Sequence, residues 1–288
     1  MTRTAISPRL AISTLENTPY SDPVDVVRAR SALVGNRFSR IEWLDETGST
    51  NSDLAERARS AGPEQVLGAR HQTAGRGRLG RTWVAPVDAS ILCSALVRSS
   101  LGLSESHLIT TALGLSARAA CASVAGVTPG LKWPNDLVLP HDDGSDRKLA
   151  GILAESVTVS GEPPVIVVGI GLNVKWPSAL PDELVSIATA LNHHTSEPVD
   201  PTELVVALLD DFAGRLNLVE DRGPSSLTED VRAASATLGR RVRVELPNAI
   251  LVGTATDITP DGSLVVTDDR GVSRPVSVGD VIHLRSGD

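Results

Sequence analysis

Two long segments carry apolar residues at the spacing of an amphipathic helix. In Ser104–Val124, apolar side chains recur every three or four positions after a serine that suits a helix N-cap. Pro201–Leu218 repeats this periodicity. Val24–Leu33 and Asp53–Ala58 are shorter and consist mainly of good helix formers. The pattern therefore predicts two long and two short helices.

Apolar runs rich in valine and isoleucine, broken by glycine, proline and aspartate, predict strands between these helices. The runs are Arg40–Leu44, Gln65–His71, Ser90–Val97, Leu131–Leu139, Lys148–Val159 and Pro164–Val174. A parallel α/β fold would show regular alternation of strands and helices, and this chain does not. We therefore expect an α+β fold for this part of the chain.

The pattern changes near Leu238. From Arg241 onwards, five short alternating runs are separated by turn signals at Pro247-Asn248, Pro260–Gly262 and Asp269–Gly271. Five strands in about fifty residues indicate a small β-barrel. The 288 residues suit about two domains at roughly 150 residues each. We expect a loose leader at 1–22, a large domain at 23–236 and the barrel at 237–288.

Composition and charge exclude several classes of protein. Hydrophobic residues make up 41% and charged residues 22% of the chain, which excludes a largely disordered, collagen-like or coiled-coil protein. The net charge of -8 disfavours a protein that coats nucleic acid, because such a grip needs clustered cations. No apolar run approaches the ~18 residues of a membrane span, and no signal peptide is present. We expect a cytoplasmic protein.

The usual metal and hydrolase patterns are missing. Cys93 and Cys121 lie far apart and form no Cys-x-x-Cys pair, so we expect two buried thiols rather than a zinc site or a disulfide. The six histidines show no metal-ligand spacing, and no Gly-x-Ser-x-Gly elbow occurs.

The segment Gly75–Arg81 alternates glycine with arginine and matches the Gly-x-Gly-x-x-Gly dinucleotide pattern. That pattern must open a helix and be followed by an acidic residue about twenty positions on. Thr82–Pro86 cannot begin a long helix, and residues 97–103 hold no carboxylate. The alternatives are a solvated basic turn and an anion-binding flap, and we favour a flap that is mobile when empty.

Three further groups of residues have both a structural and a chemical interpretation. Lys148 is one of only three lysines among 27 basic residues; it could be an exposed strand-end lysine or an ammonium that binds a phosphate. Asn135-Asp136 could form a turn or a contact to Mg²⁺. Ser49–Asn51 could cap a helix, since Thr50-x-x-Asp53 resembles a capping box, and the same hydroxyls and helix N-terminus could also exchange hydrogen bonds with a ligand.

Four ordered blocks between residues 47 and 175 resemble the motifs of biotin protein ligases. They are Gln72–Trp83, Lys132–Leu137, Lys148–Leu153 and Gly169–Asn173. The barrel-like tail extends the similarity to most of the chain. The resemblance implies a mixed sheet flanked by helices, a class II synthetase-like biotin/lipoate ligase core at 23–236 and an SH3-like barrel. It also implies ATP with Mg²⁺ as co-substrate, biotin as substrate and no tightly bound prosthetic group.

The resemblance also assigns roles to residues. Lys148 and Arg78 would be catalytic. Biotin would contact Ser49, Thr50, Asn51, Gln72, Gly75, Arg76, Gly77, Arg78, Lys148, Gly151 and Ile152. The nucleotide would contact Arg78, Arg81, Trp83, Lys148, Asn135, Asp136 and Asn173, with Asp136 as the Mg²⁺ ligand.

The implied activity is activation of biotin as biotinyl-5'-AMP and its transfer to a lysine of a biotin carboxyl carrier domain. The alternatives are a lipoate or octanoate ligase and a biotin-sensing protein without transfer activity. The expected partners are carrier domains of acyl-CoA or pyruvate carboxylases, with neither DNA nor a membrane. About forty residues precede the core, which are too few for a winged helix. We expect a monomer or a weak homodimer.

Overall fold

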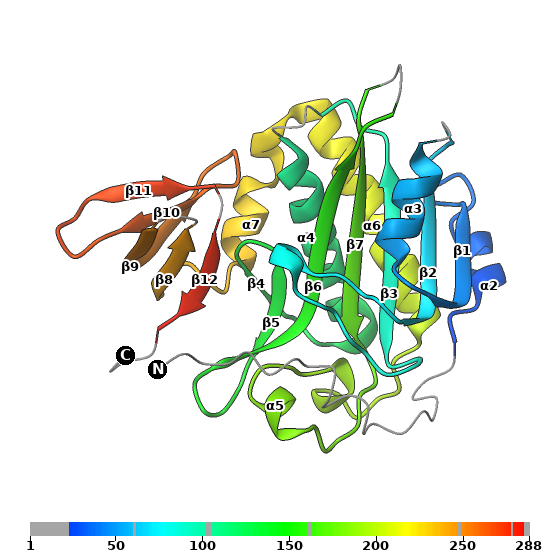
Figure 1. Ribbon diagram of the computed structural model, residues 1–288, viewed down its shortest axis with the longest axis horizontal. Coiled ribbons are helices and arrows are strands. Elements are labelled where there is room, and N and C mark those ends of the chain that lie inside the picture. Colours follow the sequence, from blue (N-terminus) through cyan, green and yellow to red (C-terminus); the bar gives the residue numbers. More distant parts are fainter. Residues whose placement is uncertain are drawn as a thin grey trace.

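The structure is a computed structural model that describes residues 23–59, 62–101, 105–159, 163–246, 249–277 and 279–284. The expected leader, the cap at Ser104 and the turn at Pro247-Asn248 lie outside these ranges. Figure 1 shows a large sheet covered by helices, with a second, smaller sheet beside it.

Seven strands form one mixed sheet in the order β1-β2-β3-β7-β6-β5-β4. Only β1 and β2 run parallel, and every other neighbouring pair is antiparallel. The strands are Ile41–Thr47 (β1), Gln65–Gln72 (β2), Ser90–Val97 (β3), Gly130–Lys132 (β4), Asp136–Pro140 (β5), Asp146–Val157 (β6) and Val165–Asn173 (β7). This arrangement confirms the expected α+β fold with a mixed sheet.

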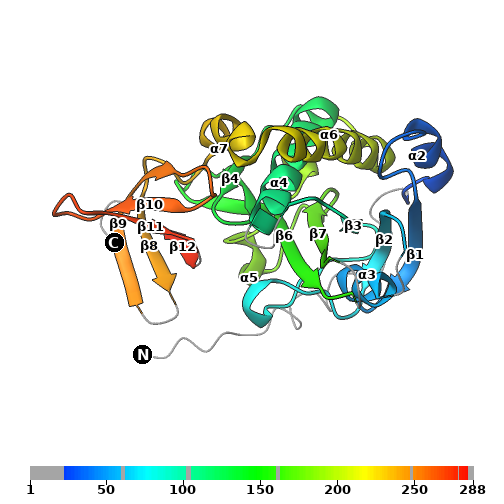
Figure 2. The same ribbon diagram turned by 90° about the horizontal axis from the view of Figure 1, so that it is seen from above.

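Helices cover both faces of this sheet. Figure 2 shows α4 and α6 together on one face, and α3 on the other, where the arginine-rich segment also lies. The helices are Val26–Ala32 (α2), Thr50–Ala58 (α3), Ser106–Ala125 (α4), Asp182–Val185 (α5), Pro201–Arg222 (α6) and Thr228–Ala234 (α7). Short 3-10 helices lie at Arg78–Gly80 (η1), Leu191–His193 (η3) and Pro224–Leu227 (η4). The main hydrophobic core lies between the sheet and the pair α4 and α6.

Five strands form the second sheet, in the order β11-β10-β9-β8-β12, with all neighbours antiparallel. They are Arg241–Leu246 (β8), Ala249–Ile258 (β9), Leu264–Thr267 (β10), Ser273–Val276 (β11) and Asp280–His283 (β12). Trp133 belongs to the hydrophobic core of this second sheet, although it lies between β4 and β5 of the first. The site therefore has a direct connection to the C-terminal unit.

The prediction of one continuous strand at Leu131–Leu139 is wrong. The structure divides it into β4 and β5, which pair with each other through a turn at residues 133–135. Pro134 has no N–H to donate to a strand ladder, and Asn135 favours turns. The high apolar content of the whole segment therefore conceals the turn that interrupts it.

The expectation that no segment has the character of a membrane span also needs correction. Within the described ranges, one helix, α4 with its 20 residues, is long and apolar enough to cross a membrane by length and composition alone. Its alanines and leucines raise the mean hydropathy of the helix, and the serines and threonines between them interrupt any continuous apolar run. More than half of its most apolar window, 56%, is buried in the protein, and α4 packs against α6 and the sheet, as a core helix does.

Candidate active site

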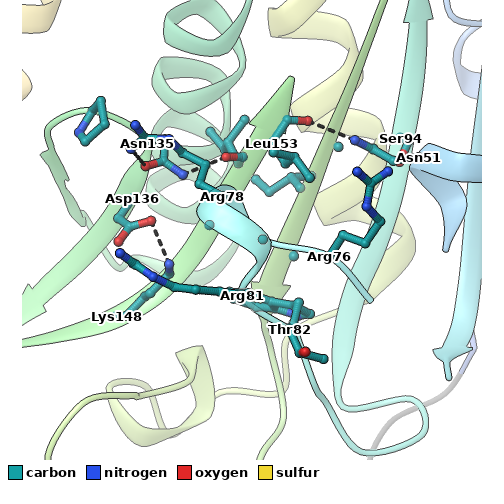
Figure 3. A pocket seen from close by; sticks show the side chains of 18 of the residues that line it. Asn51, Arg76, Arg78, Arg81, Thr82, Ser94, Asn135, Asp136, Lys148 and Leu153 are labelled. Atoms are coloured by element: carbon teal, nitrogen blue, oxygen red, sulfur yellow. Dashed lines mark hydrogen bonds and ion pairs between the residues drawn. The ribbon is translucent and has the colours of Figure 1, made fainter. Parts of the chain in front are cut away.

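A cavity of about 330 Å³ opens on the sheet face that carries α3. Its wall is formed by the start of α3, the segment 76–83, the turn at 133–135, strands β6 and β7, and β12 of the second sheet. Most of the predicted site residues line it: Ser49, Thr50, Asn51, Gln72, Arg76, Gly77, Arg78, Arg81, Trp83, Asn135, Asp136, Lys148, Gly151 and Ile152. Figure 3 shows Arg78, Lys148 and Asp136 at one end, and Asn51 and Ser94 at the other.

The glycine and arginine segment forms a short hairpin that we call the flap, residues 75–83. The Gly77 amide donates to the Arg81 carbonyl (2.7 Å), and the Trp83 amide donates to that of Gly75 (2.9 Å). A side chain at position 75 would place its Cβ only 2.4 Å from the Trp83 carbonyl oxygen, so only glycine permits this closure. The sole helical turn of the flap is the three-residue η1, which agrees with rejecting a dinucleotide-binding helix.

The indole of Trp83 anchors the flap to the sheet. Gly151 of β6 pairs with Gly171 of β7, and the ring lies over both. A Cβ on Gly171 would lie 2.4 Å from the ring, and one on Gly151 would lie 3.0 Å from it. The buried indole N–H has no hydrogen-bond partner among the described residues.

Lys148 lies at the cationic end of the cavity. Its Nζ is 2.7 Å from Oδ1 of Asp136 and 5.4 Å from the centroid of the Trp83 ring. Asp136 of β5 pairs with Gly151 of β6, and Lys148 of β6 pairs with Val138 of β5, on either side of a register shift between Leu137 and Val138. The Asp136 Oδ1 is buried and accepts no well-aligned hydrogen bond, so the ammonium contact is its main compensation.

Each flap arginine contacts a protein group from a different element. Arg76 forms an ion pair with Glu155 (2.7 Å), and Arg81 forms one with Asp280 of β12. Arg78 has no carboxylate partner among the described residues; it donates to Oδ1 of Asn135 (3.0 Å) and to the carbonyl of Gly279 (3.3 Å). Burial lowers the pKa of the Arg78 guanidinium from its ordinary value. The flap thus bridges the first sheet and the second.

The other end of the cavity is polar and mostly neutral. Oε1 of Gln72 accepts from the amide and the hydroxyl of Thr50 (2.8 and 3.0 Å). The Ser94 hydroxyl lies 2.7 Å from that of Thr50 and donates to Oδ1 of Asn51 (2.6 Å). A Cβ on Gly169 would lie 2.1 Å from the same Oδ1, so glycine there allows the amide to reach the sheet. This end offers donors and acceptors with little net charge.

The capping-box interpretation of Thr50-x-x-Asp53 is wrong. The N-cap of α3 is Ser49, which makes no side-chain capping bond. The Thr50 hydroxyl bonds to Gln72 instead, and the Asp53 carboxylate accepts from the hydroxyl of Thr47. Tertiary partners from β1 and β2 therefore replace the local ones that the pattern suggests.

Two predicted residues lie outside the cavity wall. Gly75 belongs to the base of the flap. Asn173 is only 2% exposed; its side chain donates to the Thr189 carbonyl (2.9 Å) and accepts from Ser90 (3.2 Å). The structure thus does not bring Asn173 to the cavity, and its hydrogen bonds give it a role in joining β3, β7 and the segment after α5.

The residues also allow a test of whether a divalent cation could be held. The described part of the chain has no group of three or more histidine, cysteine, aspartate or glutamate side chains placed to bind a metal. Asp136 supplies one carboxylate, and the Asn135 amide is turned to the Ile152 carbonyl (2.7 Å). One carboxylate suits Mg²⁺ that arrives on a nucleotide, because phosphates and waters supply its other ligands.

Several cavity residues were missed by sequence reasoning. Ser94, Lys132, Trp133, Gly171 and Asp280 all line the cavity. Lys132 stands inside a quoted motif and is one of three lysines, so the sequence carried a signal for it. Asp280 carried none, because it belongs to the second sheet and reaches the site only through the fold.

Comparison with known proteins shows the family to which this chain belongs. A model of the "biotin/lipoate A/B protein ligase family" matches residues 44–173, and one of the "biotin protein ligase C terminal domain" matches 237–284. The biotin--[acetyl-CoA-carboxylase] ligase of Mycobacterium tuberculosis is 38% identical, covering 91% of this chain and 97% of that protein. The bifunctional ligase/repressor BirA of Escherichia coli is 26% identical, covering 96% of this chain and 84% of that protein.

A solved structure shows the same fold. The biotin protein ligase of Aquifex aeolicus, in complex with biotin and ATP, superposes with a TM-score of 0.72 and 26% identity, covering 86% of this chain and 100% of that one. The sequence and the structure therefore agree that this chain belongs to the biotin protein ligase family.

Proposed function

We propose that this chain activates biotin with ATP, forming biotinyl-5'-AMP, and then transfers biotin to a lysine of a carrier domain. The observation that carries the proposal is one cavity with a neutral polar end and a cationic end, which the flap covers. Biotin has a neutral ureido ring and an acidic tail, and ATP adds further negative charge. A ligase of the same family was solved with both molecules bound.

The ureido ring fits the polar end. Its carbonyl and two N–H groups need donors and acceptors, which Thr50, Gln72 and Ser94 provide close together. An analogue without the ring would leave these polar groups unpaired, so the site would favour biotin over such an analogue. The biotin-binding residues we propose are Ser49, Thr50, Asn51, Gln72, Gly75, Arg76, Gly77, Arg78, Lys148, Gly151 and Ile152.

The triphosphate fits the cationic end. Lys148 and the flap residues Arg78 and Arg81 can turn from their present protein partners to phosphate oxygens, since guanidinium and ammonium groups bind these strongly. Asp136 would contact the Mg²⁺ that ATP carries. The nucleotide-binding residues we propose are Arg78, Arg81, Trp83, Lys148, Asn135 and Asp136, with Asn173 as a supporting residue behind them.

The chemistry needs no nucleophile from the protein. An oxygen of the biotin carboxylate attacks the α-phosphorus, a new O–P bond forms, and the bond to the β-phosphate breaks as pyrophosphate leaves with its electron pair. An acceptor amine then attacks the biotinyl carbonyl and AMP leaves. Two unit charges about 4 Å apart repel by about 4 kcal/mol at an effective dielectric of 20, so Arg78 and Lys148 serve to offset that repulsion.

Water must be kept from the reactive anhydride between the two steps. The flap covers the cationic end, where Arg78 holds both Asn135 and the second sheet. The indole of Trp83 closes the space over β6 and β7. A closed flap therefore retains the intermediate until an acceptor arrives.

The acceptor and the setting are part of the proposal. The name of the Mycobacterium tuberculosis relative points to the carrier of acetyl-CoA carboxylase, and we extend this to acyl-CoA or pyruvate carboxylases. We also propose a cytoplasmic monomer or weak homodimer that binds neither DNA nor a membrane, with domains at 23–236 and 237–288.

Pyrophosphate release tests the activation step. With ATP and Mg²⁺, the chain should release pyrophosphate when biotin is added and show no such increase with lipoate or octanoate. A lipoate or octanoate ligase would give the opposite preference, because it needs a longer apolar tunnel than the polar end provides. A biotin-sensing protein would bind biotin and release none.

A further inference from the structure

Most cations of the cavity are neutralised by a carboxylate. Arg76 is paired with Glu155, and Lys148 with Asp136. Arg81 is paired with Asp280. Lys132, on the edge strand β4, lines the same cavity, but its side chain has no hydrogen bond or ion pair to any described residue. It is the lysine that the proposed nucleotide contacts leave unused.

The carboxylates near Lys132 have other, closer partners. Asp136, its register partner on β5, contacts Lys148 at 2.7 Å. Asp146 contacts His283 at 2.8 Å and Arg240 at 2.9 Å. Burial lowers the pKa of the Lys132 ammonium, against the opposing effect of the two carboxylates. The protein therefore holds a half-buried cation beside the site without a paired anion of its own, and an anion that arrives with a substrate would compensate it.

From the order of the strands we infer which part of ATP lies near Lys132. The polar end of the cavity lies beside β3 and β7, Lys148 is on β6, and Lys132 is on β4, two strands further along the sheet. Attacking and leaving oxygens stand roughly in line in phosphoryl and nucleotidyl transfer. With biotin at the polar end and the α-phosphorus at Lys148, pyrophosphate departs along the sheet towards β4.

The space beyond Lys132 supports the same direction. A second cavity, of about 680 Å³, lies between the N-terminal end of α4, α7 and the turn after β9. Lys132 lines both cavities, together with the turn at 133–135. A group bound at Lys132 thus has room to leave without passing the biotin end.

We propose that Lys132 binds the β- and γ-phosphates of ATP and stabilises the charge that develops on the departing pyrophosphate. The proposal rests on the activation reaction proposed above. When the bond between the α-phosphorus and the bridging oxygen breaks, the electron pair stays on pyrophosphate, and the ammonium of Lys132 lies beside that charge while Lys148 stays with the α-phosphate and the biotin carboxylate.

The test separates the two half-reactions. Lys132→Met removes the charge and keeps the length of the side chain, and Lys132→Arg restores a charge. Lys175→Met is the matched control, because Lys175 is the third lysine and is exposed outside both cavities. Each protein is assayed for ATP formation from preformed biotinyl-AMP and pyrophosphate, and for transfer from preformed biotinyl-AMP to a carrier domain. Biotin binding by calorimetry shows that each variant is folded.

We expect Lys132→Met to raise the KM for pyrophosphate and for ATP about tenfold or more, as for the loss of one charge-assisted hydrogen bond. Transfer from preformed biotinyl-AMP should stay at the wild-type rate, Lys132→Arg should recover most of the loss, and Lys175→Met should behave as wild type. An unchanged KM for pyrophosphate would overturn the proposal, and so would an equal loss in transfer, which would make Lys132 a base for the acceptor amine. A wild-type chain that forms no ATP would instead overturn the proposed function.

Discussion

Gly151 and Gly171 face each other across β6 and β7, and the indole of Trp83 fills the space that their side chains would occupy. The flap is therefore held against the sheet by the fit of one large ring to two missing Cβ atoms. This contact connects the backbone of the sheet with the position of every arginine in the flap.

We predict that Gly171→Ala dislodges Trp83. The new Cβ would lie 2.4 Å from the ring, which requires the indole to move. The change should reduce biotin activation by about tenfold or more, as a small misplacement of a binding group does, while the fold is retained. Gly214→Ala in α6 is the matched control, since its added Cβ would have no atom within 4 Å apart from the neighbouring backbone of its own helix. Equal pyrophosphate release by Gly171→Ala and wild type would show that the ring does not position the flap.

Arg78 connects the flap to Asn135 and to the second sheet. We predict that Arg78→Gly lets biotinyl-AMP escape, so that lysines of bystander proteins become labelled. Asn135→Ala removes one of its partners and should show a weaker form of the same effect. The measurement is the fraction of biotinyl-AMP that stays with the protein after rapid filtration. Full retention by Arg78→Gly would contradict a role for this residue in closing the site.

The contact between Asp146 and His283 predicts a loss of stability in acid. Burial lowers the pKa of His283. Burial acts to raise the pKa of Asp146, but the hydrogen bond from His283 and the charge of Arg240 outweigh it, so this pKa is lowered too. The folded state thus favours neutral His283 and ionised Asp146. Stability should fall as the pH drops below about 6.5, where the unfolded histidine gains a proton, and again as Asp146 is protonated.

Urea unfolding between pH 8 and pH 3 measures this dependence, because the contribution of Asp146 is lost only below its unfolded pKa of about 3.9. His283→Gln removes the titrating ring and should flatten the part of the curve between pH 7 and pH 5. The same slope in both proteins would mean that other groups set the acid sensitivity.

The two cysteines should be inert in the folded protein. Burial raises the pKa of Cys93 and of Cys121 to about 12, and the thiolate is the reactive form. A thiol reagent at pH 8 should therefore modify neither residue until urea unfolds the chain, and then both. Rapid modification without denaturant would show that one of these sites opens in the native state.

Much of the fold follows from local patterns. Ser90–Val97 is a strand with the bounds that its apolar run predicts, and α6 begins at Pro201 as expected. These segments succeed because propensity, periodicity and tertiary burial agree in them. The segment 131–139 fails because Pro134 and Asn135 divide it at the turn that carries Asp136 to the site. Local rules are therefore broken where the site is built.

The site itself is only partly visible in the sequence. The motif residues Lys148 and Arg78 line one cavity together with Thr50. The motifs do not reveal that Trp133 packs into the core of the second sheet, or that Asp280 pairs with Arg81. Such contacts join residues more than a hundred positions apart, and no spacing along the chain encodes them.

The most direct test of the central claim is ATP-dependent transfer of labelled biotin to a purified carrier domain, with the wild-type chain compared with Lys148→Ala. The account predicts labelling of one carrier lysine that requires ATP and Mg²⁺, and a decrease of about a hundredfold in Lys148→Ala, because one cation at the reacting phosphate is lost. Labelling by Lys148→Ala at the wild-type rate, with biotin and ATP both bound, would contradict it.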